Sequence, residues 1–184
     1  MAPSKNGGNR TRRMLVAAMR NLLTRQNFQK ITVNDICEEA MISRSTFYVH
    51  FEDKYALLKQ LLADIRIEIA ERDQDKGPRE RILTAMEHLQ ENAKWMTNTF
   101  AGNYDRELIR TLQEYFSDGF LKLIEMKEDI PPESARIHAL FYAAGVASVA
   151  GWWVMNRFPV SAEQIADEQF LLLSPILPED FPLA

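Results

Sequence analysis

The chain has 184 residues, of which 46% are hydrophobic, and this content is ample for the buried core of a globular protein. Its formal net charge of -4 argues against a nucleic-acid-binding protein when the chain is taken as a whole, because contact with phosphates needs an excess of Lys and Arg. The charge is unevenly distributed, however: residues 1–60 contain ten Lys and Arg against five Asp and Glu, whereas residues 61–184 contain twelve against twenty-one. This asymmetry indicates a polyanionic partner for the N-terminal part only.

The start of the chain and its cysteine content bear on location. Residues 1–10 lack the hydrophobic region of a secretory signal peptide and are expected to form a disordered, mildly basic arm. The single cysteine, Cys37, cannot form an intrachain disulfide, and we expect it to be a buried structural thiol. No Cys/His cluster has the spacing of a zinc site, so the sequence predicts no metal site and a reducing, cytoplasmic location.

Helical periodicity dominates the chain, whereas the alternating patterns of strands are scarce, so we predict an all-α protein. Gly77 and Pro78 break the chain between an N-terminal and a C-terminal group of helices, and later prolines separate further helices. The predicted helices cover residues 11–26, 32–40, 43–50, 54–73, 78–99, 104–128, 132–157 and 161–173.

Two short helices are predicted to begin close together. Thr32 and Asp35 have the spacing of a capping box, so a helix starts at Thr32. Ser43 can cap a second helix eleven residues later, which leaves room only for a tight turn at Met41. Two short helices that meet across such a turn form the helix-turn-helix unit, whose second helix enters the major groove of DNA.

The second helix would present polar side chains outward. Phe47 and Phe51 are four residues apart and share the inward face, which leaves the outward face to other residue types. Arginine bonds bidentately to guanine, serine bonds to either partner of a base pair, and tyrosine contacts a thymine methyl or a phosphate. We therefore expect base contacts from Arg44, Ser45 and Tyr48, and backbone contacts from Thr46, His50, Lys54 and the amide ends of the helices that begin at Thr32 and Ser43.

Each of these side chains also has a simpler interpretation, since Tyr48 and His50 can serve only packing or solubility. Their grouping on one capped helix, within the basic part of the chain, favours DNA binding.

Residues 11–62 closely resemble the DNA-binding signature of the TetR/AcrR repressor family. The residues that carry the resemblance are Phe28, Ile31, Thr32, Val33, Asp35, Ile36, Ala40, Ile42, Ser43, Arg44, Ser45, Thr46, Phe47, Tyr48, His50, Phe51, Lys54, Leu57 and Leu58.

The resemblance implies phosphate contacts for Thr32 and Lys54, and recognition-helix contacts for Arg44, Ser45, Thr46, Tyr48 and His50. Two positions depart from the family pattern. Met41 stands where the turn commonly has Gly, and Cys37 stands where the supporting helix commonly has Ala. Met41 is expected to strain or reshape the turn, because a non-glycine residue with positive φ is uncommon.

The long helix predicted at 132–157 carries no formal charge over residues 137–156, which is the length of a membrane span. Many small residues and the lack of flanking Lys/Arg clusters favour burial in protein, so we expect no membrane contact. Ala139, Ala143, Ala147 and Gly151 give this helix a smooth face, and we assign it, with the helix at 161–173, to a dimer contact. The alternative is a core helix within one chain.

Several aromatic and histidine side chains of the C-terminal part can line a ligand pocket, or they can equally be core. Two histidines are not expected to bind metal, because no carboxylate or cysteine lies at ligand spacing. The candidate pocket residues are His88, Trp95, Phe116, Phe120, His138 and Tyr142, with Met96, Phe100, Phe141 and Trp152 as further members.

The combined expectation is an all-α, homodimeric transcriptional regulator with a DNA-binding domain (11–53), a connecting helix (54–76) and a C-terminal helical bundle for dimerisation and effector sensing (77–184). By the resemblance it is a repressor that binds a palindromic operator and is released by an effector. The alternative is a regulator or adaptor whose C-terminal part binds a protein. No catalytic motif or cofactor loop is present, so we predict neither enzymatic activity nor a cofactor.

Overall fold

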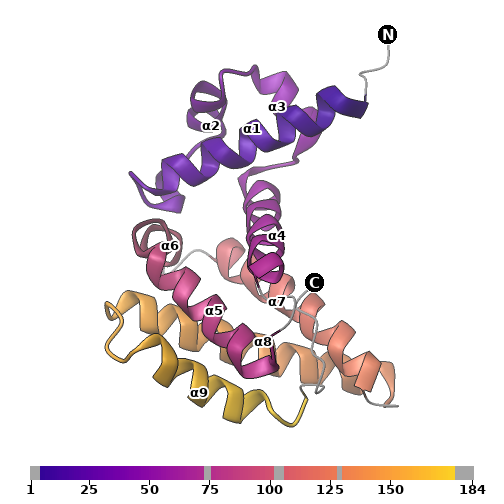
Figure 1. Cartoon of the computed structure of the whole chain (residues 1–184). Coiled ribbons are helices and arrows are strands. Elements are labelled where there is room, and N and C mark those ends of the chain that lie inside the picture. The colour runs from indigo at the N-terminus through magenta and orange to yellow at the C-terminus, as the bar shows by residue number, and fades with distance from the viewer. Residues whose placement is uncertain (1–4, 73–75, 102–105, 128–129, 177–184) are drawn as a thin grey trace. The chain divides into compact units, whose positions relative to one another are not determined.

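A computed structural model describes residues 5–72, 76–101, 106–127 and 130–176, and these residues form helices and connecting turns without a strand (Figure 1). The predicted all-α class is confirmed. The elements are α1 (Lys5–Leu23), the 3-10 turn η1 (Phe28–Lys30), α2 (Val33–Ala40), α3 (Arg44–His50), α4 (Lys54–Arg72), α5 (Pro78–Glu91), α6 (Ala93–Phe100), α7 (Arg106–Lys127), α8 (Pro132–Met155) and α9 (Ala162–Leu173).

The chain divides into two compact units. The first consists of Met1–Asp64 and Lys94–Asp105, and the second of Ile65–Ala93 and Arg106–Ala184. The unit boundary falls within α4, so this single helix belongs to both units.

The first unit is held together by the apolar face of α1. Leu15, Ala18, Met19 and Leu22 are buried, as their helical spacing predicts. In this unit α1 contacts α2 and α3, and α2 contacts α3. The Asn98 side chain of α6 donates a hydrogen bond to the last carbonyl of α1, Leu23 O, at 2.8 Å. This contact satisfies a carbonyl that has no partner within its own helix.

The second unit contains α5, α7, α8 and α9, in which α7 packs on α8 and α5 packs on α9. Trp153 is completely buried, and its indole N–H donates a hydrogen bond of 2.9 Å to Val160 O. The ring of Phe158 meets Trp153 edge-on at 4.7 Å, and Ser161 begins α9 with a capping box. These contacts fix the loop between α8 and α9 against the core.

The small-residue face predicted for dimer contact is buried within the chain at two of its four positions, and Ala147 and Gly151 are half-buried. Ala139 and Ala143 are completely buried in the hydrophobic core of the second unit, so the alternative of an intramolecular core face is the correct one for these two residues. The opposite side of α8 exposes large apolar side chains, among them Ile137, Phe141 and Trp152.

By length and composition α8 would be able to cross a membrane, since its apolar window has a mean hydropathy of 1.4 and is only 28% buried within the chain. Within one chain, only one side of this helix is buried in protein, as predicted, and the other side is exposed.

The start of the first helix and the end of the fifth differ most from the predicted boundaries, while α1 also ends at Leu23, three residues early, and α8 at Met155, two residues early. Helix α1 begins at Lys5, so residues 5–10 of the predicted arm are helical. The helix predicted at 78–99 is interrupted after Glu91, where Asn92 leaves the helical conformation with φ -103° and ψ 23°. The backbone N–H and the side-chain amide of Asn92 both donate to His88 O, at 3.1 and 2.9 Å, so Asn92 caps the end of α5. The interruption almost coincides with the boundary between the two units at residues 93 and 94.

Candidate nucleic-acid interface

The first helix of the predicted helix-turn-helix begins with the expected capping box. Asp35 N donates to Thr32 Oγ1 at 3.2 Å, and Thr32 N donates to Asp35 Oδ2 at 2.8 Å. These two bonds satisfy backbone donors that the first turn of a helix leaves without partners. The start of α2 is thereby fixed by two residues, Thr32 and Asp35, that lie three positions apart in the sequence.

The turn between the two helices is built on Met41. This residue adopts the left-handed conformation with φ 54° and ψ 44°, and Ile42 N donates to Cys37 O at 3.0 Å. The predicted positive φ at a non-glycine residue is confirmed. Met41 is 86% exposed, so its side chain adds no packing that would offset the cost of this backbone conformation. Cys37 is buried, as expected, and burial raises the pKa of its thiol.

The recognition helix α3 is capped by Ser43, whose Oγ accepts a hydrogen bond from Thr46 N at 3.2 Å. Phe47 is completely buried and Phe51 is 5% exposed, so these two rings anchor α3 to the core of the first unit. Their inward direction forces the intervening side chains outward, because residues four apart share one face of a helix.

The structure brings the predicted DNA contacts together in the first unit, on α3 and the adjacent helix starts. Most are exposed, and Thr46, His50 and Lys54 are half-buried. Two further exposed residues of this region were not predicted: Val49 on α3, which is 73% exposed, and Asn34 on α2. The spacing from Ser45 to Val49 is one helical turn, so the same periodicity argument would have identified Val49.

The Arg44 guanidinium is held in place by two neighbouring side chains. Its Nη1 donates to Asn34 Oδ1, and its Nη2 donates to the Tyr48 hydroxyl at 3.3 Å. The guanidinium carbon also lies 5.8 Å from the centre of the Tyr48 ring, within the range of a cation–π contact. The side chain with the strongest expected base preference is therefore oriented before DNA binds.

Lys54, for which a phosphate contact is predicted, makes several contacts within the chain. Its Nζ donates to Phe28 O at 3.0 Å, Gln29 O at 3.2 Å and Ile31 O at 2.9 Å. It also lies 4.6 Å from the centre of the Phe28 ring. An ammonium group has three donors, and the three carbonyls of the η1 turn match that number.

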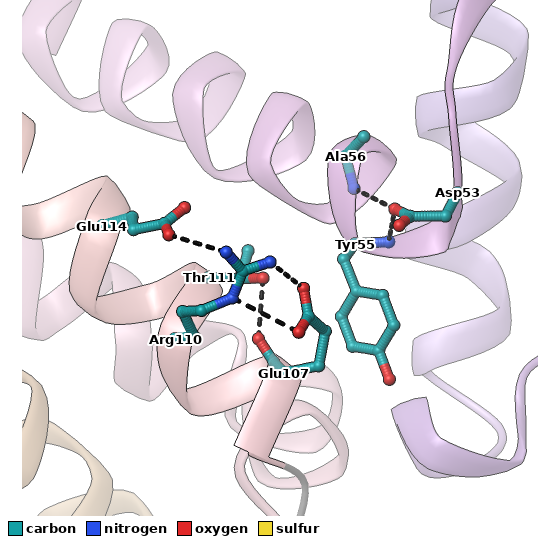
Figure 2. A network of polar contacts seen from close by, with 7 residues as sticks. All are labelled: Asp53, Tyr55, Ala56, Glu107, Arg110, Thr111 and Glu114. Carbon is teal, nitrogen blue, oxygen red and sulfur yellow. Dashed lines mark hydrogen bonds and ion pairs between the residues drawn. The ribbon is translucent and has the colours of Figure 1, made fainter.

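The beginning of α4 is fixed next to this lysine. Asp53 Oδ1 accepts hydrogen bonds of 2.8 Å from both Tyr55 N and Ala56 N, as Figure 2 shows. The carboxylate stabilises the positive end of the helix. Asp53 caps the start of α4, and Lys54 connects this start to the turn that precedes α2.

A salt bridge ties the turn that follows α1 to α2. Arg25 Nη2 lies 2.6 Å from Glu39 Oε2, and its hydrogen bond lowers the pKa of Glu39. The pair is solvent-exposed, so its contribution to stability is small. Because Glu39 neutralises Arg25, this arginine adds no net charge to the unit. The exposed Arg12 and Arg13 of α1 do contribute to its positive charge.

The predicted pocket residues are divided between the two units. Of the six main pocket candidates, Trp95 belongs to the first unit and the other five belong to the second. Phe120 and Tyr142 lie 6.0 Å apart between ring centres, and Phe116 packs against the same hydrophobic core. His88 is buried and His138 is exposed.

No group of three or more potential metal ligands occurs among the residues that the structure describes.

Comparison with known proteins identifies both units of the chain. Residues 15–61 match the family model for bacterial regulatory proteins of the tetR family, and residues 77–174 match a model for the C-terminal region of transcriptional regulators. The chain belongs to the TetR family of transcriptional regulators. It is accordingly a DNA-binding helix-turn-helix protein, of a family whose members are generally not enzymes.

A curated relative matches a short part of the chain. This is YxbF of Bacillus subtilis, an uncharacterized HTH-type transcriptional regulator, which is 33% identical over 49 residues. The match covers 27% of this TetR-family chain and 13% of YxbF.

Solved structures of TetR-family regulators share the fold over most of both chains. A regulator from Streptococcus agalactiae has a TM-score of 0.61 at 23% identity, with 91% of this chain and 96% of that chain covered. The dihydroxyacetone kinase operon activator DhaS has a TM-score of 0.56 at 22% identity, covering 90% and 96%. Thermus thermophilus FadR, a repressor in complex with lauroyl-CoA, has a TM-score of 0.56 at 21% identity, covering 89% and 93%.

Proposed function

We propose that this TetR-family protein is a homodimeric repressor that reads a palindromic operator with α3 and is released by an effector bound to its C-terminal unit. The observation that carries the proposal is the set of exposed side chains on a capped, anchored α3. The set combines a bidentate guanine reader, hydroxyl groups and an exposed aliphatic side chain, which are the chemistries that distinguish base pairs in the major groove.

The proposed contacts divide into two kinds. Base contacts come from Arg44, Ser45 and Tyr48, to which we add Val49 as an apolar neighbour for a thymine methyl group. Phosphate contacts come from Thr46 and His50 and from the N-terminal amides of α2 and α3, whose capping residues are Thr32 and Ser43.

For Lys54 we propose an indirect role. Because its ammonium group is bonded to three carbonyls, it supports DNA binding by fixing α4 to the η1 turn. This replaces the phosphate contact that the family resemblance implies for it.

The proposed dimer contact uses the exposed apolar side of α8. Ile137 and Phe141 lie one helical turn apart and Trp152 three turns further on, so the three share one face, where they are 65%, 75% and 52% exposed. Leu171 and Leu172 of α9 are also large, apolar and exposed. A second copy of the chain is the proposed partner, because a two-fold dimer would present two recognition helices to a palindrome.

A protein partner is the second candidate for the same surface, since an exposed tryptophan such as Trp152 is typical of binding hot spots. The mass of the free protein distinguishes the two. A dimer in the absence of other proteins supports the first, and a stable monomer supports the second.

The proposed effector acts through α4, because this helix includes residues of both units. Binding must favour one orientation of α4 over another to change the separation of the two recognition helices. The lauroyl-CoA complex of Thermus thermophilus FadR supports a small-molecule effector as the form of control. A cytoplasmic location follows from the proposed genomic target.

Selection of bound duplexes from a random pool, with the full chain, tests the proposal. We expect enrichment of two inverted half-sites whose centres lie about 10 base pairs, or a multiple of that, apart. Affinity for the enriched site should fall steeply with salt, and a reporter promoter that carries the site should be repressed. Enrichment of no sequence, or salt-independent binding, would refute DNA reading; activation of the reporter would refute only repression.

A further inference from the structure

Asn34 has no evident task in the folding of α2. It lies at the second position of the helix and is exposed, so it adds little to the core. The cap of α2 is complete without it, because Thr32 and Asp35 form both bonds of the capping box. The side-chain oxygen of Asn34 instead accepts a hydrogen bond from Nη1 of Arg44, ten residues later.

The contact leaves the guanidinium able to read a base. Arginine has five N–H donors, and the bonds to Asn34 and to the Tyr48 hydroxyl use one hydrogen on each Nη. Three donors remain for the O6 and N7 acceptors of a guanine. Asn34 approaches from α2 and Tyr48 from α3, so the two contacts restrict the guanidinium from two helices.

We propose that Asn34 is a positioning residue for DNA recognition, which holds the Arg44 guanidinium in the orientation that reads guanine in the major groove. The proposal rests on the proposed role of Arg44 as a base reader. A flexible arginine loses rotamer freedom when it binds a base, whereas one that is already oriented loses less. Asn34 therefore increases discrimination between bases without itself touching the base.

The neutral amide suits this task. A carboxylate at the same place would form an ion pair with Arg44, and its negative charge would also face the phosphates. Asparagine offers an acceptor that orients the guanidinium but leaves its charge available to the DNA.

A double-mutant cycle tests the proposal with the full-length dimer. The affinities of the wild type, Asn34→Ala, Arg44→Ala and the double variant are measured for the selected operator and for a duplex with adenine in place of the guanine that Arg44 reads. Asn21→Ala on α1 is the control, because it makes the same change at another exposed asparagine of the first unit. Thermal unfolding of each variant verifies that the fold is retained.

We expect Asn34→Ala to lower the preference for guanine about 3- to 10-fold, the cost of immobilising one free side chain. The salt dependence should remain that of the wild type, since no phosphate contact is lost. In the Arg44→Ala background, Asn34→Ala should have no further effect on the preference.

Three outcomes would overturn the proposal, and they are distinguishable. An unchanged preference in Asn34→Ala, with a reduced one in Arg44→Ala, refutes positioning by Asn34 alone. A full effect of Asn34→Ala in the Arg44→Ala background means that Asn34 contacts a base directly. An unchanged preference in Arg44→Ala refutes base reading by Arg44, and the role proposed for Asn34 fails with it.

Discussion

Replacement of Lys54 by Met removes the ammonium group while it keeps a long, unbranched side chain. The three carbonyl acceptors are not affected equally. Phe28 O retains a hydrogen bond of 3.1 Å from Ile31 N, and Gln29 is exposed, so its carbonyl can be hydrated. The carbonyl of Ile31 is affected most, because the hydrogen bond of 2.9 Å that it loses from Nζ is partly buried.

The expected loss in the free energy of unfolding follows from these differences. One charge-assisted hydrogen bond contributes about 1.5–3 kcal/mol, and the cation–π contact with Phe28 adds about 0.5–1 kcal/mol. We expect Lys54→Met to cost about 2–4 kcal/mol in urea denaturation. Lys122→Met on α7 is the control, since it makes the same change at an exposed lysine.

The salt dependence of DNA binding separates the two roles of Lys54. Each phosphate contact contributes about -0.9 to the slope of log affinity against log salt. We expect Lys54→Met to weaken binding but to leave this slope unchanged. A variant with wild-type stability and a slope smaller by about one unit would refute the structural role and restore the phosphate contact.

Three further variants test separate parts of the structure. Thr32→Ala removes the capping box of α2 and should cost about 0.5–2 kcal/mol of stability in chemical denaturation; no loss would contradict its role as a cap. Phe141→Asp should yield monomers in analytical ultracentrifugation and weaken operator binding, whereas an intact dimer would remove the exposed side of α8 from the interface. Burial raises the pKa of Tyr115 to about 12 from 10.0, so the folded chain keeps a proton that the unfolded chain releases. Stability should therefore fall by about 2–3 kcal/mol as the pH rises from 10 to 12, and Tyr115→Phe should remove this component; equal pH profiles for both proteins would refute it.

The helix-turn-helix was predictable because its determinants are close together in the sequence. Thr32 and Asp35 are three residues apart, and Ser43 bonds to a backbone amide within the first turn of its own helix. A capping pattern of this kind implies its geometry directly. The turn at Met41 followed from the short distance between the two caps.

The roles of Asn34 and Lys54 were not predictable in this way. The partner of Asn34 is ten residues away, and the carbonyl partners of Lys54 are 23 to 26 residues away. Which residues meet across these distances depends on the packing of α2 against α3 and of α4 against the η1 turn, and no local pattern encodes it. The family resemblance supplied a phosphate-contact role for Lys54, but not the three carbonyl contacts within the chain.

The orientation of α8 was ambiguous for a related reason. The helix is apolar on more than one side, so its periodicity predicts a helix without indicating which face is inside. Small residues suit close packing both within a chain and between chains, and only the packing of α7 against α8 decides between them. The break at Asn92 was missed because asparagine is also tolerated within helices.

The most direct test of DNA reading by α3 is photo-crosslinking from position 49. Val49 is 73% exposed on α3, so its replacement by p-benzoylphenylalanine places a reactive group on the proposed reading face. We predict a crosslink to one base position in each half-site of the selected operator, and none from the same group at position 122 on α7. A bound operator without a crosslink from position 49, or with an equal yield from position 122, would contradict the assignment of α3 as the recognition helix.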